Sequence, residues 1–442
     1  MGSDRLNVLL VVLEGARPDH LSDAGYERDT TPFLGQVARD GVRFTHAFTT
    51  APASVPAHAS MFTGLFPSLH GVTEESPVLA STPRVLAEML KDAGYRTAAF
   101  CPYAPLGPES GFGRGFDRFY TQRGGGRITG RAADYARRAS DRVLGRGDAG
   151  ARRSTQALLD WLAADAQPFF AFMHYREPLR PIRPPAPYDR SFMSPSIDAA
   201  QARAVNQADQ GKPRSVSAEE GRALTALYDG AMRYVDLRLK QVADSLISDG
   251  RWDQTLVIVT ASYGEDLGDN GQIDGPPAMR DSALRVPLIL RCPGRIPAGF
   301  VVQEFAQSVD VLPTIAALTG CELGAPVQGR TLLSAAGATA GPNAVVAELF
   351  RSPTEARPVR RKVIRTRREK LVWQSDEANA VYDLGRDPDE QQNLFATDSE
   401  RADRLRRNLF DRLADSQRWA AAHGLSPGES GRPAVQRQGV HT

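Results

Sequence analysis

Short apolar runs alternate with amphipathic segments over the first three quarters of this chain. Each run is four to eight residues long and rich in Val, Ile, Leu or Phe, which predicts buried strands. The predicted strands are residues 6–13, 97–100, 169–173, 256–260 and 286–290. Strands that are separated by helices favour a large, mostly parallel central sheet in an α/β fold.

The segments between these runs carry apolar residues at helical spacing, and several begin with Ser, Thr or Pro, as helix starts do. The predicted helices are residues 32–39, 82–93, 155–164, 217–248 and 309–318. We expect these helices to cover both faces of the sheet, which gives a three-layer sandwich. Residues 107–131 are rich in glycine and residues 189–214 are polar, so both are predicted to be long loops at the rim of a site.

The pattern changes after about residue 335, where short strands follow one another without long helices. They are predicted at residues 345–349, 361–365, 370–374 and 380–384, followed by a charged helix near 399–421. A chain of 442 residues exceeds what one compact core normally supports. We therefore expect an N-terminal α/β domain over residues 1–335 and a small C-terminal α+β domain over residues 336–442.

Charge and cysteine content identify no partner. The formal net charge is +2 with basic residues spread along the chain, so nucleic acid is not an expected partner. The first apolar run is too short to span a bilayer and lacks the flanks of a signal peptide, which predicts a soluble, cytoplasmic protein with no membrane partner. Cys101, Cys292 and Cys321 lie far apart in the sequence and are predicted to be reduced.

Six segments of the chain, taken in order, match the motifs of one known enzyme family. The N-terminal signature is matched by residues 7–72, which begin NVLLVVLEGARPDHL and continue through TTAPASVPAHASMFTGLFPSLHGV. Further matches are PFFAFMHYREPLRP, TLVIVTASYGEDLGDNG, LRVPLILRCPG, VDVLPTIAALTG and EKLVWQSDEANAVYDLGRDPDEQQNL. In these segments the chain resembles the sulfatase family of the alkaline phosphatase superfamily. The resemblance covers almost the whole chain and implies an alkaline-phosphatase/sulfatase-like sandwich and a sulfuric ester hydrolase as the family activity.

The resemblance places Ser54 at the nucleophile position of the family, within the window Ser54 to His58. The family has C/S-x-P-x-R there, so His58 stands where Arg belongs, and modification of Ser54 to formylglycine is left open. Two interpretations of Ser54 compete. It is a nucleophile paired with His58, or it caps the helix that starts after Pro56, and we favour the cap.

The metal site of the family is a divalent cation, Ca²⁺ or Mg²⁺, held by several carboxylates. Here Leu13 and Glu14 follow the first strand, and Ser262 and Tyr263 stand at the second metal loop. Glu14 is then a weak, almost isolated ligand, and we expect no cofactor.

The groups that would bind the sulfate ester or protonate its leaving group are also replaced. Leu179 follows Glu177 and Pro178 where the family has a His, and leucine cannot transfer a proton. Cys101 to Ala104 replace a segment that supplies Lys and His in many sulfatases, and Asp274 and Gly275 stand near a His-Gly position. Arg280 is a possible substitute for the missing cations.

Three functions remain open. The first is a sulfatase-like pseudoenzyme, impaired or inactive, that binds a small anionic ligand or a protein partner. The second is an active sulfate or phosphate ester hydrolase that uses Ser54 and His58 in a rearranged centre. The third is a module that binds an anionic partner through a basic strand pair. Its residues are Arg357, Arg360, Arg361, Lys362, Arg365, Arg367, Arg368 and Lys370. We predict that Glu14, Ser54, Leu179, Ser262 and Tyr263 meet at the C-terminal edge of the central sheet.

Overall fold

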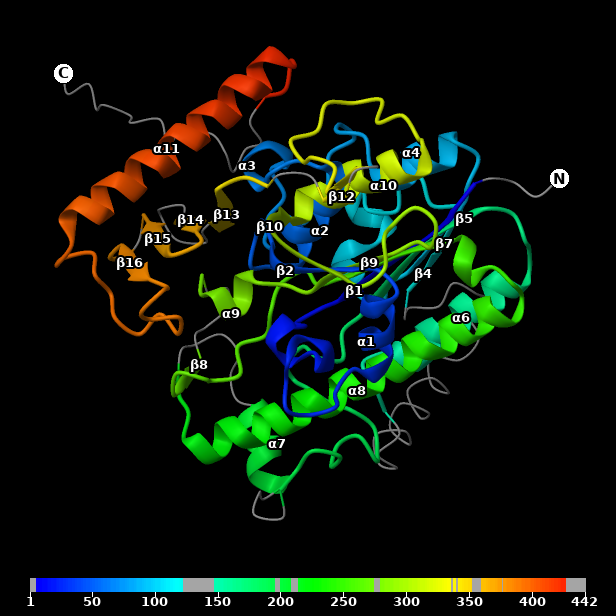
Figure 1. The fold of residues 1–442 in the computed structure, drawn as a ribbon, viewed down its shortest axis with the longest axis horizontal. Coiled ribbons are helices and arrows are strands. Elements are labelled where there is room, and N and C mark those ends of the chain that lie inside the picture. The colour runs from blue at the N-terminus through cyan, green and yellow to red at the C-terminus, as the bar shows by residue number, and fades with distance from the viewer. Residues whose placement is uncertain are drawn as a thin grey trace.

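The computed structural model describes residues 5–121, 147–194, 199–207, 214–273, 279–334, 337–338, 341–351, 359–375 and 377–426. Two sheets organise these residues, as Figure 1 shows. The larger sheet has eight strands in the order β10-β2-β9-β7-β1-β5-β3-β4. All its neighbouring strands are parallel except at β9, which runs antiparallel to both β2 and β7. The predicted central, mostly parallel sheet is therefore confirmed.

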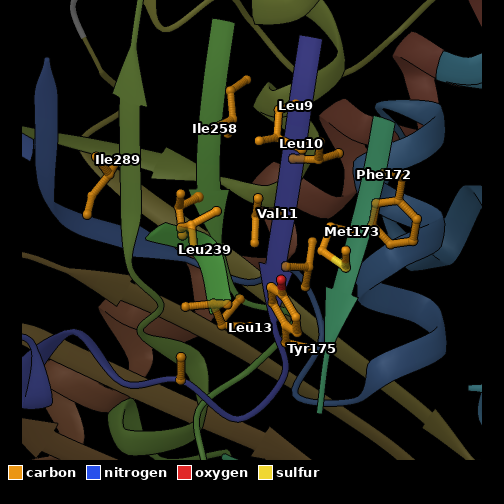
Figure 2. Close-up of a cluster of buried hydrophobic side chains, with 14 of the residues drawn as sticks. Leu9, Leu10, Val11, Leu13, Phe172, Met173, Tyr175, Leu239, Ile258 and Ile289 are labelled. Carbon is orange, nitrogen blue, oxygen red and sulfur yellow. The ribbon is translucent and has the colours of Figure 1, made fainter. Parts of the chain in front are cut away.

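In spatial order, the strands of this sheet are β10 (Phe300–Gln307), β2 (Val42–Phe48), β9 (Leu288–Arg291), β7 (Thr255–Thr260), β1 (Asn7–Leu13), β5 (Phe169–Tyr175), β3 (Arg96–Phe100) and β4 (Arg118–Tyr120). Strands β1, β5 and β7 are buried along their whole length, as expected for strands covered on both faces. Figure 2 shows side chains of these strands packed together with Leu239 and Ile289.

Helices cover both faces of the central sheet. Figure 1 shows α1 (Pro32–Arg39), α6 (Ala151–Ala163) and α8 (Ala218–Ser248) on one face, and α2 (Ser54–Thr63), α4 (Leu86–Asp92) and α10 (Val311–Thr319) on the other. Ser217 caps α8 as its sequence predicts, because its Oγ accepts the Glu220 N–H at 3.2 Å while Glu220 accepts the Ser217 N–H at 2.8 Å. The three-layer arrangement thus follows from the amphipathic segments.

The second sheet is a four-stranded antiparallel meander. It contains β13 (Ala344–Arg351), β14 (Val359–Thr366), β15 (Glu369–Gln374) and β16 (Ala380–Asp383), and α11 (Ser399–Ala422) packs on it (Figure 1). These elements match the predicted strands and charged helix. The boundary between the domains stays a prediction, since residues 335 and 336 lie outside the described part of the chain.

The remaining elements within the described ranges are short. They are α3 (Pro67–His70), α7 (Ala199–Gln207), α9 (Asp281–Leu284), β6 (Arg214–Ser215), β8 (Gln272–Ile273), β11 (Leu333–Ser334), β12 (Gly337–Ala338) and six 3₁₀ turns, η1 (Pro18–His20), η2 (Ser22–Ala24), η3 (Ala104–Leu106), η4 (Pro108–Ser110), η5 (Trp252–Gln254) and η6 (Ser308–Asp310).

Two predicted loops contain regular structure. Within 107–131, β4 adds an edge strand to the sheet, and within 189–214 the described residues include α7 and the start of β6. Strands β2 and β10 were not predicted, because charged and polar residues interrupt their apolar pattern. Strand β10 is the edge of the sheet and β2 is its neighbour, and partial exposure there allows such residues.

A buried ionic cluster joins the two sheets. Lys370 of β15 is fully buried, and its Nζ lies 3.0 Å from Asp281 Oδ1 at the start of α9 and 2.5 Å from Glu390 Oε1. Arg365 of β14 pairs with the other oxygen of Asp281 at 3.1 Å. We call these four residues the interdomain ion cluster. It places two of the residues of the predicted basic strand pair inside the molecule.

Two further members of the basic strand pair form ion pairs with carboxylates of the protein itself. Lys362 Nζ lies 2.5 Å from Glu348, and Arg361 lies 2.7 Å from Glu377. Arg357 lies outside the described residues. These internal pairs leave less positive charge for an anionic partner than the sequence suggests.

Cys101 and Cys292 are buried free thiols, and Cys321 is a partly buried one. Within the part of the chain that the structure describes, no helix combines the length and the apolar character needed to cross a membrane.

Candidate functional site

Polar side chains gather where four parallel strands of the central sheet end. Glu14 follows β1, Arg176 follows β5, Ser262 and Tyr263 follow β7, and Cys101 follows β3. Because these strands are neighbours and run in the same direction, their C-terminal ends form one edge of the sheet. Clefts outside this edge are the usual ligand sites of open α/β sheets.

Main-chain hydrogen bonds hold the segment after β1 against its neighbours. The Glu14 N–H donates to Tyr175 O at 2.8 Å, and the Gly15 N–H donates to Tyr263 O at 3.1 Å. Gly15 has φ +85°, and a side chain there would also meet the backbone of Leu179 at 3.3 Å. Glycine is therefore required at this position. The predicted neighbours Glu14, Leu179 and Tyr263 are brought together by backbone contacts.

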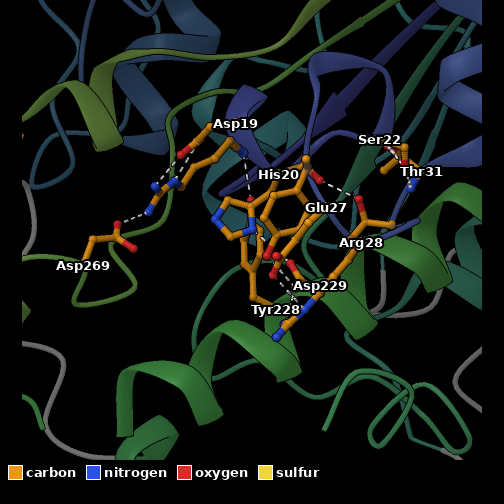
Figure 3. A network of polar contacts seen from close by, with 12 residues as sticks. Asp19, His20, Ser22, Glu27, Arg28, Thr31, Tyr228, Asp229 and Asp269 are labelled. Carbon is orange, nitrogen blue, oxygen red and sulfur yellow. Dashed lines mark hydrogen bonds and ion pairs between the residues drawn. The ribbon is translucent and has the colours of Figure 1, made fainter. Parts of the chain in front are cut away.

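A polar network fixes the next residues to α8 (Figure 3). The Tyr228 hydroxyl accepts the Arg17 N–H at 2.7 Å and donates to Gly15 O at 3.0 Å. His20 Nδ1 lies 2.9 Å from Asp229, which also binds Arg28 at 2.8 Å. The network consists of buried or half-buried groups that satisfy one another, so its role is to position the loop that carries Glu14.

The Glu14 carboxylate is buried, and its neighbours are cationic. Its Oε2 accepts a hydrogen bond from Arg176 Nε at 2.7 Å and lies 3.2 Å from His174 Nε2. The Arg176 guanidinium also stacks on Tyr103, 4.2 Å from the ring centre. Burial alone would raise the pKa of Glu14, but His174 and Arg176 outweigh it and hold the pKa well below its usual range.

His174 is a buried cation at neutral pH. Burial lowers the pKa of an imidazole, but Cys101 and the Glu14 carboxylate raise the pKa of His174 to about 9. Cys101 Sγ lies 3.3 Å from His174 Nδ1, and Glu14 lies on the other ring nitrogen. His174 and Arg176 thus carry two positive charges against the single charge of Glu14.

This arrangement does not fit a divalent cation. Glu14 Oε2 is occupied by Arg176 and His174, so a cation approaching that oxygen would meet two positive groups. Ser262 and Tyr263 supply no carboxylate. Across the described ranges, His, Cys, Asp and Glu side chains form no group of three or more that could hold a metal ion. Arg176 and His174 thus place positive charge directly beside Glu14.

Ser54 is the first residue of α2 and does not cap it. The N-cap residue is Ala53, and Ser54 Oγ is buried with no hydrogen-bond partner among the described residues. Its nearness to Glu14 contributes to lowering the pKa of that carboxyl. The predicted cap is therefore wrong, because the helix begins at Ser54, three residues earlier than the start after Pro56 that the sequence pattern indicates.

Glu74 supplies the cap in place of Ser54. Its Oε1 accepts the Val55 N–H at 2.8 Å, in the first turn of α2. Glu74 belongs to the segment after α3, and its side chain is exposed. A carboxylate at this end of a helix is stabilised by the partial positive charge of the free N–H groups.

His58 lies one turn after Ser54 but is not hydrogen-bonded to its hydroxyl. His58 Nδ1 donates to the Ser54 carbonyl oxygen at 2.7 Å, and Nε2 has no partner among the described residues. Burial, followed by repulsion from His174, lowers the pKa of His58 to about 3. His58 is thus a neutral imidazole whose Nε2 keeps its lone pair.

The third loop carries no proton donor that faces this centre, as far as the described residues show. Leu179 is half-buried, and the neighbouring Glu177 points to α6, where its Oε1 accepts the Ala151 N–H at 2.7 Å. Burial and the charge of Asp148 raise the pKa of Glu177 to about 7. Arg280 is turned toward the second sheet and donates to Glu390 O at 3.3 Å. Asp274 and Gly275 lie outside the described residues.

The sequence interpretation overlooked His174, Arg176 and Glu74. His174 and Arg176 lie in the segment HYREP at the end of a predicted parallel strand, which is a position where polar residues form ligand sites. The sequence therefore contained a signal for His174 and Arg176. Glu74 had none, because its contact with Val55 depends on the path of the chain after α3.

Two family models match the chain. The sulfatase model matches residues 6–321, and the C-terminal model of N-sulphoglucosamine sulphohydrolase matches residues 269–418. The first match covers well over half of the chain. This chain belongs to the sulfatase family, within the alkaline phosphatase superfamily.

Individual relatives are distant but extensive. The uncharacterized sulfatase YidJ of Escherichia coli is 27% identical over 418 residues, covering 87% of this chain and 82% of its own. The multifunctional alkaline phosphatase superfamily protein PehA of Trinickia caryophylli is 26% identical, covering 74% and 76%. The solved phosphonate monoester hydrolase of Agrobacterium radiobacter superimposes with a TM-score of 0.76 at 23% identity, covering 95% and 96%. The last likeness shows the shared fold.

Proposed function

We propose that this protein is a sulfatase-family pseudoenzyme whose centre binds a small anionic ligand without a divalent metal and hydrolyses sulfate esters poorly or not at all. The observation that carries the proposal is the pairing of Glu14 with Arg176 and His174. Two protein cations stand beside the carboxylate that would otherwise hold the metal.

The charge balance of the centre supports an anionic ligand. Arg176 and His174 exceed the Glu14 carboxylate that they contact by one positive charge, while the second carboxylate nearby, Glu74, is held on the Val55 N–H. The Arg176 side chain remains partly exposed. Arginine presents several donors in a plane and binds carboxylates, sulfates and phosphates in pairs of hydrogen bonds. A cytoplasmic location and the absence of a nucleic acid or membrane partner remain predictions.

The loss of efficient hydrolysis follows from the groups around Ser54. A serine hydroxyl needs a base or a metal to become a nucleophile, and Ser54 Oγ has neither as a partner among the described residues. Leu179 cannot protonate a leaving group. Removal of one charge-stabilising or proton-transferring group typically costs two to four orders of magnitude in rate, about 3–5 kcal/mol.

Hydrolysis of aryl sulfate and aryl phosphate esters tests the proposal. We expect turnover in the wild type that is absent or indistinguishable from that of Ser54→Ala, measured with purified protein in the presence and absence of Ca²⁺ or Mg²⁺. Intact mass spectrometry of the native protein shows in parallel whether Ser54 has lost two hydrogens to become formylglycine. Turnover that both Ser54→Ala and Arg176→Gln abolish would overturn the proposal.

The alternative is a metal-independent ester hydrolase that uses Ser54 and His58. It is favoured by one observation, the free lone pair of His58 Nε2 within a turn of an unpartnered hydroxyl in the described part of the chain. This alternative predicts activity that Ser54→Ala and His58→Gln remove equally. The same assay therefore separates the two functions.

A further inference from the structure

The N-terminus of α2 holds an internal carboxylate beside the candidate nucleophile position. Glu74 Oε1 accepts the N–H of Val55, the residue that follows Ser54. Helix N-termini attract anions, because their N–H groups are free and the helix dipole is positive there. Ser54 is only 4% exposed, and its Oγ has no partner at the same place among the residues described. The end of the helix is thus occupied by a group of the protein itself.

Side-chain contacts place the start of α2 beside Glu14. The His58 ring of α2 lies 4.9 Å from the His174 ring, and His174 Nε2 lies 3.2 Å from Glu14. The charge of Glu74 also contributes to raising the pKa of Tyr103, which stacks on Arg176. Unlike Glu14, Glu74 is an exposed residue, and desolvation of its carboxyl against α2 raises the pKa of that group.

We propose that Glu74 occupies the anion position of the centre and acts as an internal competitor, so that an oxyanion binds only when it displaces the Glu74 carboxylate from α2. The inference rests on the proposed anion-binding function. The displaced position offers the ligand the Val55 N–H, the Ser54 hydroxyl and the outer edge of Arg176. These are donors suited to a sulfate or phosphate group, singly or as a monoester.

Neutralising Glu74 removes the competitor while leaving the rest of the cleft intact. We expect Glu74→Gln to bind inorganic sulfate and inorganic phosphate roughly tenfold more tightly than the wild type, since a like charge in contact distance is removed. The measurement is isothermal titration calorimetry on the full chain at constant ionic strength, because salt screens the effect. Glu74→Ala is the second variant, and circular dichroism verifies that both are folded.

Glu75→Gln is the matched control. Glu75 is the next residue, and its Oε1 accepts from Arg351 Nε at 3.2 Å, away from α2. The Glu75→Gln variant loses the same charge as Glu74→Gln, but it loses this charge away from α2. Its affinity for sulfate should therefore equal that of the wild type. The double variant Glu74→Gln with Arg176→Gln should lose the gain, which places the bound anion on Arg176.

Equal sulfate affinity in the wild type, Glu74→Gln and Glu74→Ala would overturn the inference. So would lower thermal stability of both variants with no gain in affinity, because Glu74 would then be a helix cap and nothing more. Failure of the proposed function gives another result, because the wild type would then hydrolyse esters in a reaction that depends on Ser54. The two failures can therefore be told apart.

Discussion

Two of the clusters of buried charged side chains in this protein are completed differently. In the interdomain ion cluster, Lys370 bridges Asp281 and Glu390, and Arg365 completes the set. At the centre, Glu14 Oε1, Ser54 Oγ, His58 Nε2 and Ser262 Oγ have no hydrogen-bond partner within the described residues. A cluster that serves stability satisfies most of its members, and in the interdomain ion cluster only Glu390 Oε2 lacks a partner among the residues described. Several unsatisfied buried atoms in one place are typical of a ligand site.

The largest expected effect is the loss of Lys370. Lys370→Met leaves the Asp281 and Glu390 carboxylates buried with only Arg365 to compensate, and breaking a buried pair in this way costs about 3–5 kcal/mol of unfolding free energy. Urea unfolding followed by circular dichroism measures it. Arg404→Met is the control, because Arg404 pairs with Glu369 on the surface and such pairs contribute about 0–1 kcal/mol. Equal effects of the two changes would remove the contrast between the clusters.

A smaller effect is expected from Glu14→Gln, and it should depend on pH. The folded-state pKa of His174 is raised from 6.5 to about 9, so its pairing stabilises the fold fully below about pH 6.5 and is lost as pH rises through 9. A shift of this size corresponds to on the order of 3 kcal/mol. In Glu14→Gln the pKa of His174 should fall, and the decline in stability between pH 6.5 and 9 should flatten.

Nuclear magnetic resonance titration of the His174 ring measures that pKa directly, and unfolding free energies across the same pH range measure the slope. His423→Gln serves as a control, because His423 follows α11, where its Nδ1 lies 2.8 Å from the Trp419 carbonyl oxygen. A His174 pKa that is unchanged in Glu14→Gln would show that the carboxylate does not hold the imidazole in its charged form.

The smallest expected effect is that of divalent metal on the wild type. A metal ion that binds only the folded state raises the free energy of unfolding, and the increase grows with the ratio of the free metal concentration to Kd. A protein without a metal site should therefore change its Tm by less than about 1 °C between EDTA and millimolar Ca²⁺, Mg²⁺ or Mn²⁺. Elemental analysis of the purified protein gives the second reading. One equivalent of tightly held metal that disappears in Glu14→Ala would contradict the prediction.

Restoring the residues of the family pattern tests the same prediction, that the wild type holds no divalent metal. The five changes are Glu14→Asp, Ser262→Asp, Leu179→His, Tyr263→His and His58→Arg. They return the ligands and the basic groups that the family pattern requires. The structure adds Arg176 to this set, because its guanidinium would still compete for the carboxylate at position 14. We expect Ca²⁺ to raise the Tm only when Arg176→Ser accompanies the other five changes.

Most of the architecture could be predicted from the sequence, because strands buried on both faces leave continuous apolar runs that a single sequence displays. Strands β1, β5 and β7 were found for this reason. Strand β10 was missed because Gln303 and Glu304 interrupt its apolar residues at the sheet edge. The apolar pattern of a strand in the sequence reflects how far the strand is buried, and edge strands are less buried than central ones.

At the candidate site, the sequence predicted which family residues are replaced but not what replaces their charge. Comparison with the family pattern identifies Leu179, Ser262 and Tyr263 one position at a time. The pairing of Glu14 with Arg176 joins residues 162 positions apart, and the contact of Glu74 with Val55 depends on how a loop returns to α2. Such contacts are set by the folded chain and leave no local signal.

The loop that carries Glu14 is held by main-chain atoms. Gly15 bridges to Gly264, the Glu265 N–H donates to Gly15 O at 2.9 Å, and the Gly264 N–H donates to Ala283 O at 2.9 Å. None of these bonds depends on which side chain stands at positions 14, 262 or 263. Evolution could therefore exchange those side chains one at a time without moving the loop, and the same freedom makes this frame a scaffold on which new chemistry can be installed.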